Sequence, residues 1–300
     1  MNFTLRQFEI LAAAADAASF SAAAKHLGIS QPAFSEAIRR IEKEIGAVLF
    51  ERTTRSLKLS EIGRHAATVA RDLVRDVDRA RERLQGSGGP ARGRIDVAAL
   101  PSIVCTAMPA ALKEFALTNP EISVALHDVQ HERAMTLVSD GSVDIAVTIK
   151  PPKIDDLAFE DVIADTAHLV CRSDHPLARR KRIRWRDLAD LPFIGITRIS
   201  SVRRLTDAAF VHGEFAVEPR YEVEQVPSAV ALVEAGLGVT ALPSLTFAMF
   251  RGRDLAVRPL IEPVLRRNVG FLTRKGRELP PGGDHFLRLT RKALRRELRL

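Results

Sequence analysis

The sequence predicts three parts: a small helical head that ends in a hairpin, one long helix, and a larger open α/β domain. Three observations lead to this prediction. Two short helical patterns separated by a glycine lie near the N-terminus, one amphipathic pattern runs over residues 60–85, and from Arg94 strand and helix patterns alternate. Such alternation is typical of an open sheet with parallel strands. The 300 residues are enough for two or three domains with separate cores.

Composition and charge narrow the class of protein. Hydrophobic residues make up 46% and charged residues 27%, as in globular proteins. The net charge of +8 favours a polyanionic partner. No apolar run approaches the roughly 20 residues of a membrane-spanning helix, and acidic residues near the N-terminus argue against a secretory signal. The 2 cysteines are too few for a disulfide framework. We therefore expect a cytoplasmic protein with no membrane partner.

The head contains a helix-turn-helix pattern over residues 19–46. A short helix over Ser21–Leu27 is followed by Gly28, where a chain leaving a helix needs positive φ. Ser30 is a good N-cap for a second helix that runs from Gln31 to about Ile45. The apolar residues of this helix form one stripe: Phe34, Ile38, Ile41 and Ile45. The pattern predicts a recognition helix for the DNA major groove, with an ordinary αα-hairpin as the alternative.

Two groups of residues are candidates for contact with DNA. Those on the open face of the second helix are Gln31, Pro32, Ala33, Ser35, Glu36, Arg39 and Arg40. Two β-prone runs over residues 49–59 predict a wing, a small hairpin whose basic side chains reach phosphates or a minor groove. The wing candidates are Arg52, Arg55 and Lys58. The helix would therefore read bases, and the wing would hold the backbone.

The long helical pattern carries one narrow apolar seam. Its members recur every three or four residues: Ile62, Ala66, Val69, Leu73, Val77, Ala80 and Leu84. A seam this narrow is typical of a helix that pairs with a second copy, although it could instead pack on its own domain. The glycine-rich stretch Gly86–Gly93 ends the helix and marks a boundary. The predicted divisions are residues 1–59, 60–88 and 91–300.

Residues 5–63 resemble the N-terminal winged helix-turn-helix of the LysR-type transcriptional regulators. The shared residues are Phe8, Ser19, Phe20, Ala23, Ala24, Leu27, Ser30, Gln31, Pro32, Ala33, Ser35, Ile38, Glu42, Gly46, Leu49, Phe50, Arg52 and Gly63. Glu36 departs from the pattern, because many members have a basic or amide residue there. A carboxylate accepts from cytosine N4 but repels phosphate. We therefore expect the operator to differ from the commonest family half-sites at that position.

The resemblance also implies the rest of the architecture. Family members carry a periplasmic-binding-protein-like effector domain of two α/β lobes. The segment Glu234–Val239, followed by Leu242 and Pro243, resembles a sequence motif typical of that domain. The implied lobes comprise residues 91–162 with 268–300, and residues 163–267. The implied partners are double-stranded DNA, a small-molecule effector, RNA polymerase, and further copies of the chain in a dimer or tetramer that pairs through the long helix.

Polar residues at strand ends and helix starts are the effector-binding candidates. In a two-lobed α/β domain these ends face the cleft, where free N–H groups favour anions. The candidates are Ser102, Thr148, Thr197, Arg198, Ser200 and Gln225. Ser102 would also cap its own helix. We expect a small and anionic effector, such as a carboxylate.

Nothing in the sequence indicates catalysis, a metal or a cofactor. His127 and Asp128 are adjacent on a predicted strand, so their side chains point to opposite faces. Standard catalytic and phosphate-binding motifs are missing from the chain. Cys105 and Cys171 lie in apolar surroundings and are expected to be buried. Two alternatives to an effector-controlled regulator remain: a cytoplasmic small-molecule-binding or enzyme domain over residues 91–300, and an architectural DNA-binding protein without effector.

Overall fold

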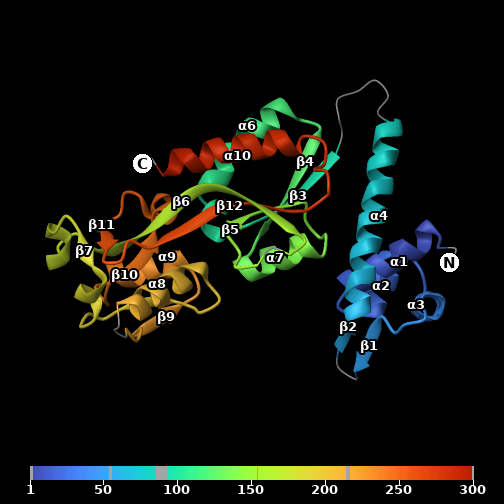
Figure 1. The fold of residues 1–300 in the computed structure, drawn as a ribbon, viewed down its shortest axis with the longest axis horizontal. Helices are drawn as coiled ribbons and strands as arrows, with labels where there is room; N and C mark the ends of the chain where they lie inside the picture. The colour runs from blue at the N-terminus through green and yellow to red at the C-terminus, as the bar shows by residue number, and fades with distance from the viewer. Residues whose placement is uncertain (1–2, 54–55, 86–92, 154, 214–216, 299–300) are drawn as a thin grey trace.

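The structure is a computed structural model that describes residues 3–53, 56–85, 93–153, 155–213 and 217–298. Figure 1 shows a helical head, a long helix beside it, and a larger α/β domain of two lobes. This arrangement confirms the predicted fold class, including the two lobes. Within the ranges just given, no helix has the length and apolar character needed to span a membrane.

The head is built from helices α1 (Leu5–Asp16), α2 (Phe20–His26) and α3 (Gln31–Ile45) and the hairpin β1 (Phe50–Thr53) and β2 (Ser56–Leu59). The apolar stripe of α3 forms its centre, because Phe34, Ile38 and Ile41 are all fully buried. Ser30 caps α3 by accepting a hydrogen bond from the Ala33 N–H. The helix has the predicted limits, and its polar face therefore points out of the head.

Helix α4 (Glu61–Gln85) packs on the head and also leaves part of its seam open. Ala67 and Ala70 are fully buried, and Ala70 belongs to the core of the head. By contrast, Ile62, Val69 and Leu73 are 53%, 40% and 38% exposed. Large apolar side chains left in water favour a further partner. The sequence predicted this open seam but not the alanine face. The side chain of Leu84 lies outside the described part.

Lobe I holds a mixed sheet between two helical layers. Strands β3 (Gly93–Ala99), β4 (Ile122–Asp128) and β5 (Ile145–Ile149) are parallel, whereas β12 (Arg266–Arg274) runs antiparallel to β5. One face packs on α6 (Ala107–Thr118) and α10 (Gly283–Glu297), and the other packs on α7 (His131–Ser139). The short helix α5 (Pro101–Val104) follows β3. The predicted parallel strands are present in β3, β4 and β5, and β12 adds an antiparallel strand that returns from lobe II.

Strand β6 (Leu157–Arg172) passes from one lobe into the other. It is a single strand of 16 residues. Its first part pairs with β12, and its second part pairs with β10 (Thr240–Pro243) and β11 (Leu255–Ile261). Aspartate is uncommon inside a strand, but β6 continues through Asp165 because an arginine neutralises this side chain.

Lobe II completes the far side of the molecule (Figure 1). Its remaining elements are the 3-10 helices η1 (Pro176–Arg179), η2 (Trp185–Leu188) and η3 (Ser244–Phe250), strands β7 (Ile183–Arg184), β8 (Ile194–Ile196) and β9 (Tyr221–Val223), and helices α8 (Ser201–His212) and α9 (Val226–Glu234). Both β6 and β12 run between the lobes, so the predicted lobe limits at residues 162 and 268 fall within connecting strands. Those limits stay a prediction.

Candidate functional site

The start of α3 presents a polar face to solvent. Phe34 points into the core of the head, and its neighbours along the helix therefore point outward. Gln31, Pro32 and Ala33 are exposed, and Ser35 is half-buried. The Gln31 amide nitrogen donates to the Ser35 hydroxyl across 3.1 Å. An amide and a hydroxyl held together on an exposed helix start are suited to hydrogen bonding with base edges in a major groove.

Glu36 is not an isolated carboxylate on this face. It forms ion pairs with Arg39 at 3.5 Å and with Arg40 at 3.4 Å, one helical turn further on. All three side chains are exposed. The two guanidinium groups therefore offset the negative charge of Glu36 on this exposed face of α3.

The wing is present as an antiparallel hairpin. Strands β1 and β2 pair in register, with Arg52 opposite Leu57 and Glu51 opposite Lys58. Lys58 is exposed on this hairpin. The side chain of Arg52 and the whole of Arg55 lie outside the described residues. Lys58 is therefore the predicted wing residue whose placement the structure reports.

A small cleft lies where the two lobes meet. Residues of both lobes line it: Leu100, Pro101, Ser102, Gln130, Ile196, Ser200, Ser201, Val202, Glu224, Gln225, Val226, Met249 and Arg267. Its volume is about 30 Å³, which is room for roughly one or two water molecules. The lobes are thus closed on each other, and a larger ligand would have to part them.

The starts of helices α5, α7, α8 and α9 converge on this cleft. Gln130 and Gln225 are the N-cap residues of α7 and α9, and neither caps its helix with its side chain. Ser200 does cap α8 and accepts from the Val202 N–H at 3.2 Å. Backbone N–H groups at helix starts, supported by the helix dipole, attract anions. The helix starts share this edge with the carboxylate of Glu224, which also lines the cleft.

Three of the predicted effector residues meet in the cleft, namely Ser102, Ser200 and Gln225. The expectation that Ser102 caps its helix is wrong. Leu100 holds the N-cap position of α5, and Ser102 is the second residue of that helix and 7% exposed. Pro101 takes the first helical position, so the N-cap lies two residues before Ser102.

Thr148, Thr197 and Arg198 do not line the cleft. Thr148 is fully buried and its hydroxyl lies 2.9 Å from Nδ1 of His131. Burial, with the nearby Arg204 charge, lowers the pKa of His131 to about 4, so this pair is neutral at pH 7. Thr197 donates its backbone N–H to the carbonyl of Val223 and follows Ile196, which does line the cleft.

A buried ion pair forms one side of the cleft, and the sequence analysis did not find it. Arg267 contacts Asp165 at 2.8 Å, and their side chains are only 5% and 0% exposed. Arg267 also donates to the Ser201 hydroxyl, while Asp165 accepts from the Ser244 hydroxyl and the Leu245 N–H. Asp165 within the strand pattern of β6 was the available signal, because a buried charge needs a partner.

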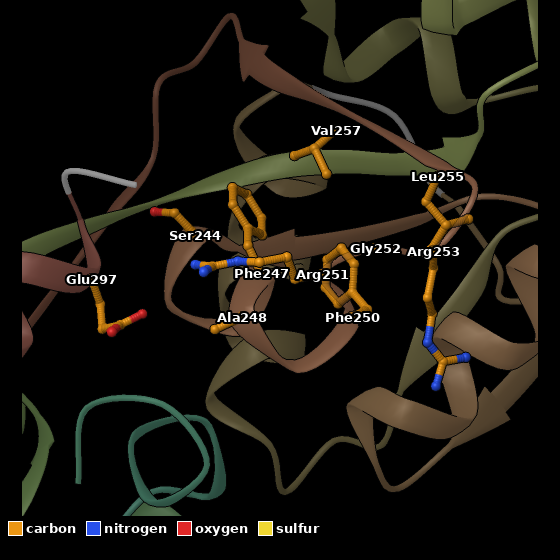
Figure 2. Close-up of a pocket in the computed structure, with 10 residues that line it drawn as sticks. All are labelled: Ser244, Phe247, Ala248, Phe250, Arg251, Gly252, Arg253, Leu255, Val257 and Glu297. Atoms are coloured by element: carbon orange, nitrogen blue, oxygen red, sulfur yellow. The ribbon is translucent and has the colours of Figure 1, made fainter. Parts of the chain in front are cut away.

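A larger cavity of about 210 Å³ lies apart from the cleft (Figure 2). It is built from η3, the loop that follows it, β11 and the end of α10. Phe247, Phe250 and Val257 supply apolar walls, and Glu297 stands at the opposite side in Figure 2. Helix starts do not converge here as they do at the cleft. This cavity is larger than the cleft, but its lining brings no helix starts together.

The cysteines and acidic residues offer little reactivity. Burial and the neighbouring Asp128 raise the pKa of the Cys105 thiol, and burial raises the pKa of Cys171 to about 11. Cys105 is exposed, contrary to expectation, because it follows the last residue of the short helix α5. Among the residues that the structure describes, no group of three or more His, Cys, Asp or Glu side chains could hold a metal ion.

Comparison with protein families divides the chain in two. Residues 5–64 match the model described as "Bacterial regulatory helix-turn-helix protein, lysR family". Residues 88–295 match the model described as "LysR substrate binding domain". The first match covers the head with its exposed α3, and the second covers both lobes and the cleft between them.

Relatives and solved structures match along nearly the whole chain. The uncharacterized HTH-type transcriptional regulator YbhD of Escherichia coli K12 is 30% identical over 95% of this chain and 89% of its own. The DNA-binding transcriptional dual regulator OxyR of the same strain is 25% identical over 92% and 90%. A full-length OxyR variant from Pseudomonas aeruginosa has a TM-score of 0.78 at 19% identity, covering 98% and 95%. CbnR in complex with its target DNA has a TM-score of 0.57 at 21% identity, covering 97% and 99%.

Proposed function

The chain belongs to the LysR family of bacterial transcriptional regulators, and from this premise we propose that a small anionic effector, bound between the two lobes, controls its action on operator DNA. The chain is a DNA-binding transcriptional regulator, and regulators of this family bind DNA and form oligomers. The proposal concerns the finer points: which residues contact DNA, what the effector is, and where it binds.

The convergence of helix starts on one cleft is the observation that carries the effector proposal. Helices α7, α8 and α9 belong to different lobes, and their first residues line the same small space. Ser102 and Gln225 add a hydroxyl and an amide there. An anion that enters between the lobes could accept from helix starts of both and so link them. Arg267 is already neutralised by Asp165, so it would orient an effector rather than supply the net charge.

The recognition face of α3 supports a division of labour in DNA binding. Gln31 and Ser35 lie where base edges come within reach, and the exposed Arg39, Arg40 and Lys58 suit phosphate contact. We propose that two heads bind two half-sites, with the open α4 seam of Ile62, Val69 and Leu73 covered by a second copy. Acting at a promoter, the assembled regulator would contact RNA polymerase.

Sensing of peroxide through a cysteine is not part of this proposal. Some relatives are named hydrogen peroxide-inducible genes activators. The thiolate is the reactive form of cysteine, and both thiols of this chain have a raised pKa. Both are therefore protonated at pH 7, and the two lie in different elements, one after α5 and one in β6.

A panel of small carboxylates, each paired with its neutral amide, tests the effector proposal. We expect some carboxylates to raise the melting temperature of the full chain and the paired amides to have little effect. Ser102→Ala should weaken binding by about 0.5–1.5 kcal/mol, the net value of one hydrogen bond. Phe247→Ala, in the cavity of Figure 2, is the matched control and should leave it unchanged. Equal stabilisation by amides, or loss of binding in Phe247→Ala only, would refute the proposal.

A further inference from the structure

Helix α4 is held against lobe I of its own chain by a set of charged contacts, in addition to its packing on the head. In Figure 1 it lies beside α7 of lobe I on one side and α1 of the head on the other. We call the set the α4 clasp: Arg71, Asp72, Arg75 and Asp76 of α4, with residues 140–144, Arg274 and Arg277 of lobe I. The partners are up to 205 residues apart in sequence.

Arg71 joins all three parts of the molecule. Its side chain is 9% exposed, and it forms an ion pair with Asp16 at the end of α1 at 2.5 Å. Its Nη1 atom donates to the backbone carbonyl of Asp140 in lobe I across 3.0 Å. One guanidinium group therefore contacts the head and the effector domain from a position on the helix between them. An arginine suits this place because its planar fork can donate in several directions.

Asp72 and Arg274 form a bidentate pair within the clasp. Two hydrogen bonds of 2.6 Å join the carboxylate to the guanidinium, and the side chains are 21% and 15% exposed. Gly141 makes the close approach possible. A Cβ atom there would lie 3.0 Å from both Asp72 Oδ1 and Arg274 Nη1, and the backbone has φ +73°. Bidentate geometry and partial burial distinguish this pair from an ordinary surface ion pair.

The elements that form the clasp on lobe I also reach the cleft. Helix α7 begins at Gln130, which lines the cleft, and ends beside Asp140, which contacts Arg71. Strand β12 contains Arg267 near one end and Arg274 at the other. A helix and a strand are stiff over such lengths, so a shift at the cleft end moves the clasp end as well.

We propose that Arg71, Asp72 and Arg274 are positioning residues that fix the DNA-binding head on lobe I of the same chain, and that α7 and β12 transmit the opening and closing of the cleft to this contact. The contact is made of polar and charged groups, so it can open and reform without exposing a hydrophobic core. The proposal does not depend on the identity of the effector. It assigns specific residues to the connection between the cleft and the DNA-binding head.

Charge-reversal variants of the full chain, measured by hydrogen-exchange mass spectrometry, test the clasp. We expect Asp72→Arg and Arg274→Asp each to lower the protection of residues 136–146 on the order of tenfold. The double variant Asp72→Arg/Arg274→Asp should regain most of it, because the pair is rebuilt with its charges reversed. Arg288→Asp on the exposed face of α10 is the matched control and should leave this segment unchanged. Failure of the double variant to recover would refute the pairing.

A co-expressed mixture of the two single variants distinguishes a contact within one chain from one between chains. If the clasp is within the chain, the mixture stays unprotected, because every chain carries one mismatched pair. Recovery in the mixture would overturn the assignment to a single chain.

Transmission is tested from the opposite lobe. Arg204 of α8 pairs with Glu132 of α7 across the cleft at 2.6 Å, and it is not part of the clasp. Arg204→Glu should loosen lobe closure and lower the protection of residues 140–144 by about two- to fivefold, as expected for an exposed pair. Adding Glu132→Arg should restore it. Full protection of residues 140–144 in Arg204→Glu, together with a loosened cleft, would refute the transmission.

Discussion

The buried pair Arg267 and Asp165 should behave as one unit in the stability of the effector domain. The carboxylate is fully buried and the guanidinium nearly so. Arg267→Met removes the positive charge and leaves a buried carboxylate with only the Ser244 hydroxyl and the Leu245 N–H. Breaking a buried pair in this way costs about 3–5 kcal/mol. Asp165→Asn should cost a similar amount, because it leaves the buried guanidinium without its countercharge.

The double variant Arg267→Met/Asp165→Asn provides the decisive comparison. It contains no buried charge, and the new amide oxygen still accepts from Ser244 and Leu245. We therefore expect it to be more stable than either single variant, with a coupling energy of at least about 2 kcal/mol. Urea unfolding followed by circular dichroism at pH 7 measures each free energy of unfolding.

An exposed pair serves as the control for this cycle. Lys292 contacts Glu114 at 2.9 Å, with side chains 71% and 47% exposed. Lys292→Met should cost less than about 1 kcal/mol. If Arg267→Met costs no more than this control, or if the two single effects simply add, the reasoning about burial is refuted.

Further predictions concern the pH dependence, the DNA surface and assembly. The wild type should lose about 2 kcal/mol of stability between pH 7 and pH 5. The imidazole of His131 takes up a proton near its ordinary pKa in the unfolded chain, but its pKa in the folded chain is about 4. Urea unfolding of His131→Asn should show no such loss. Gln31→Ala should weaken operator binding by about 1–3 kcal/mol and spare random duplexes, and a gel-shift titration showing equal losses would contradict base readout. Lys58→Ala should weaken binding to every sequence and reduce the salt slope by about 0.9, as titrations at several salt concentrations would show. Leu73→Asp should dissociate the oligomer in sedimentation; an unchanged sedimentation coefficient would mean that the seam is not an interface.

Local patterns were enough to predict the head and the order of elements. Caps, turn glycines and apolar spacing act over a few residues, so the limits of α3 follow from its own stretch of sequence. The same reasoning located Ser102, Ser200 and Gln225, because strand ends and helix starts are also local features. Whether a strand stops or continues is less local. Strand β6 continues through Asp165, and the arginine that neutralises this carboxylate stands 102 residues away in the sequence.

The sequence by itself therefore determined the class of protein, the helix-turn-helix, the long helix with its open seam, and the polar starts of the helices. Only the tertiary structure decided three contacts. The Thr148 hydroxyl is hydrogen-bonded to His131, Arg267 and Asp165 form a buried pair beside the cleft, and Arg274 pairs with Asp72 on α4. The reason is physical. Periodicity records which face of an element is buried, but it carries no information about which distant side chain meets it there. A charge buried in a low-dielectric interior is stabilised only by a contact with such a distant partner.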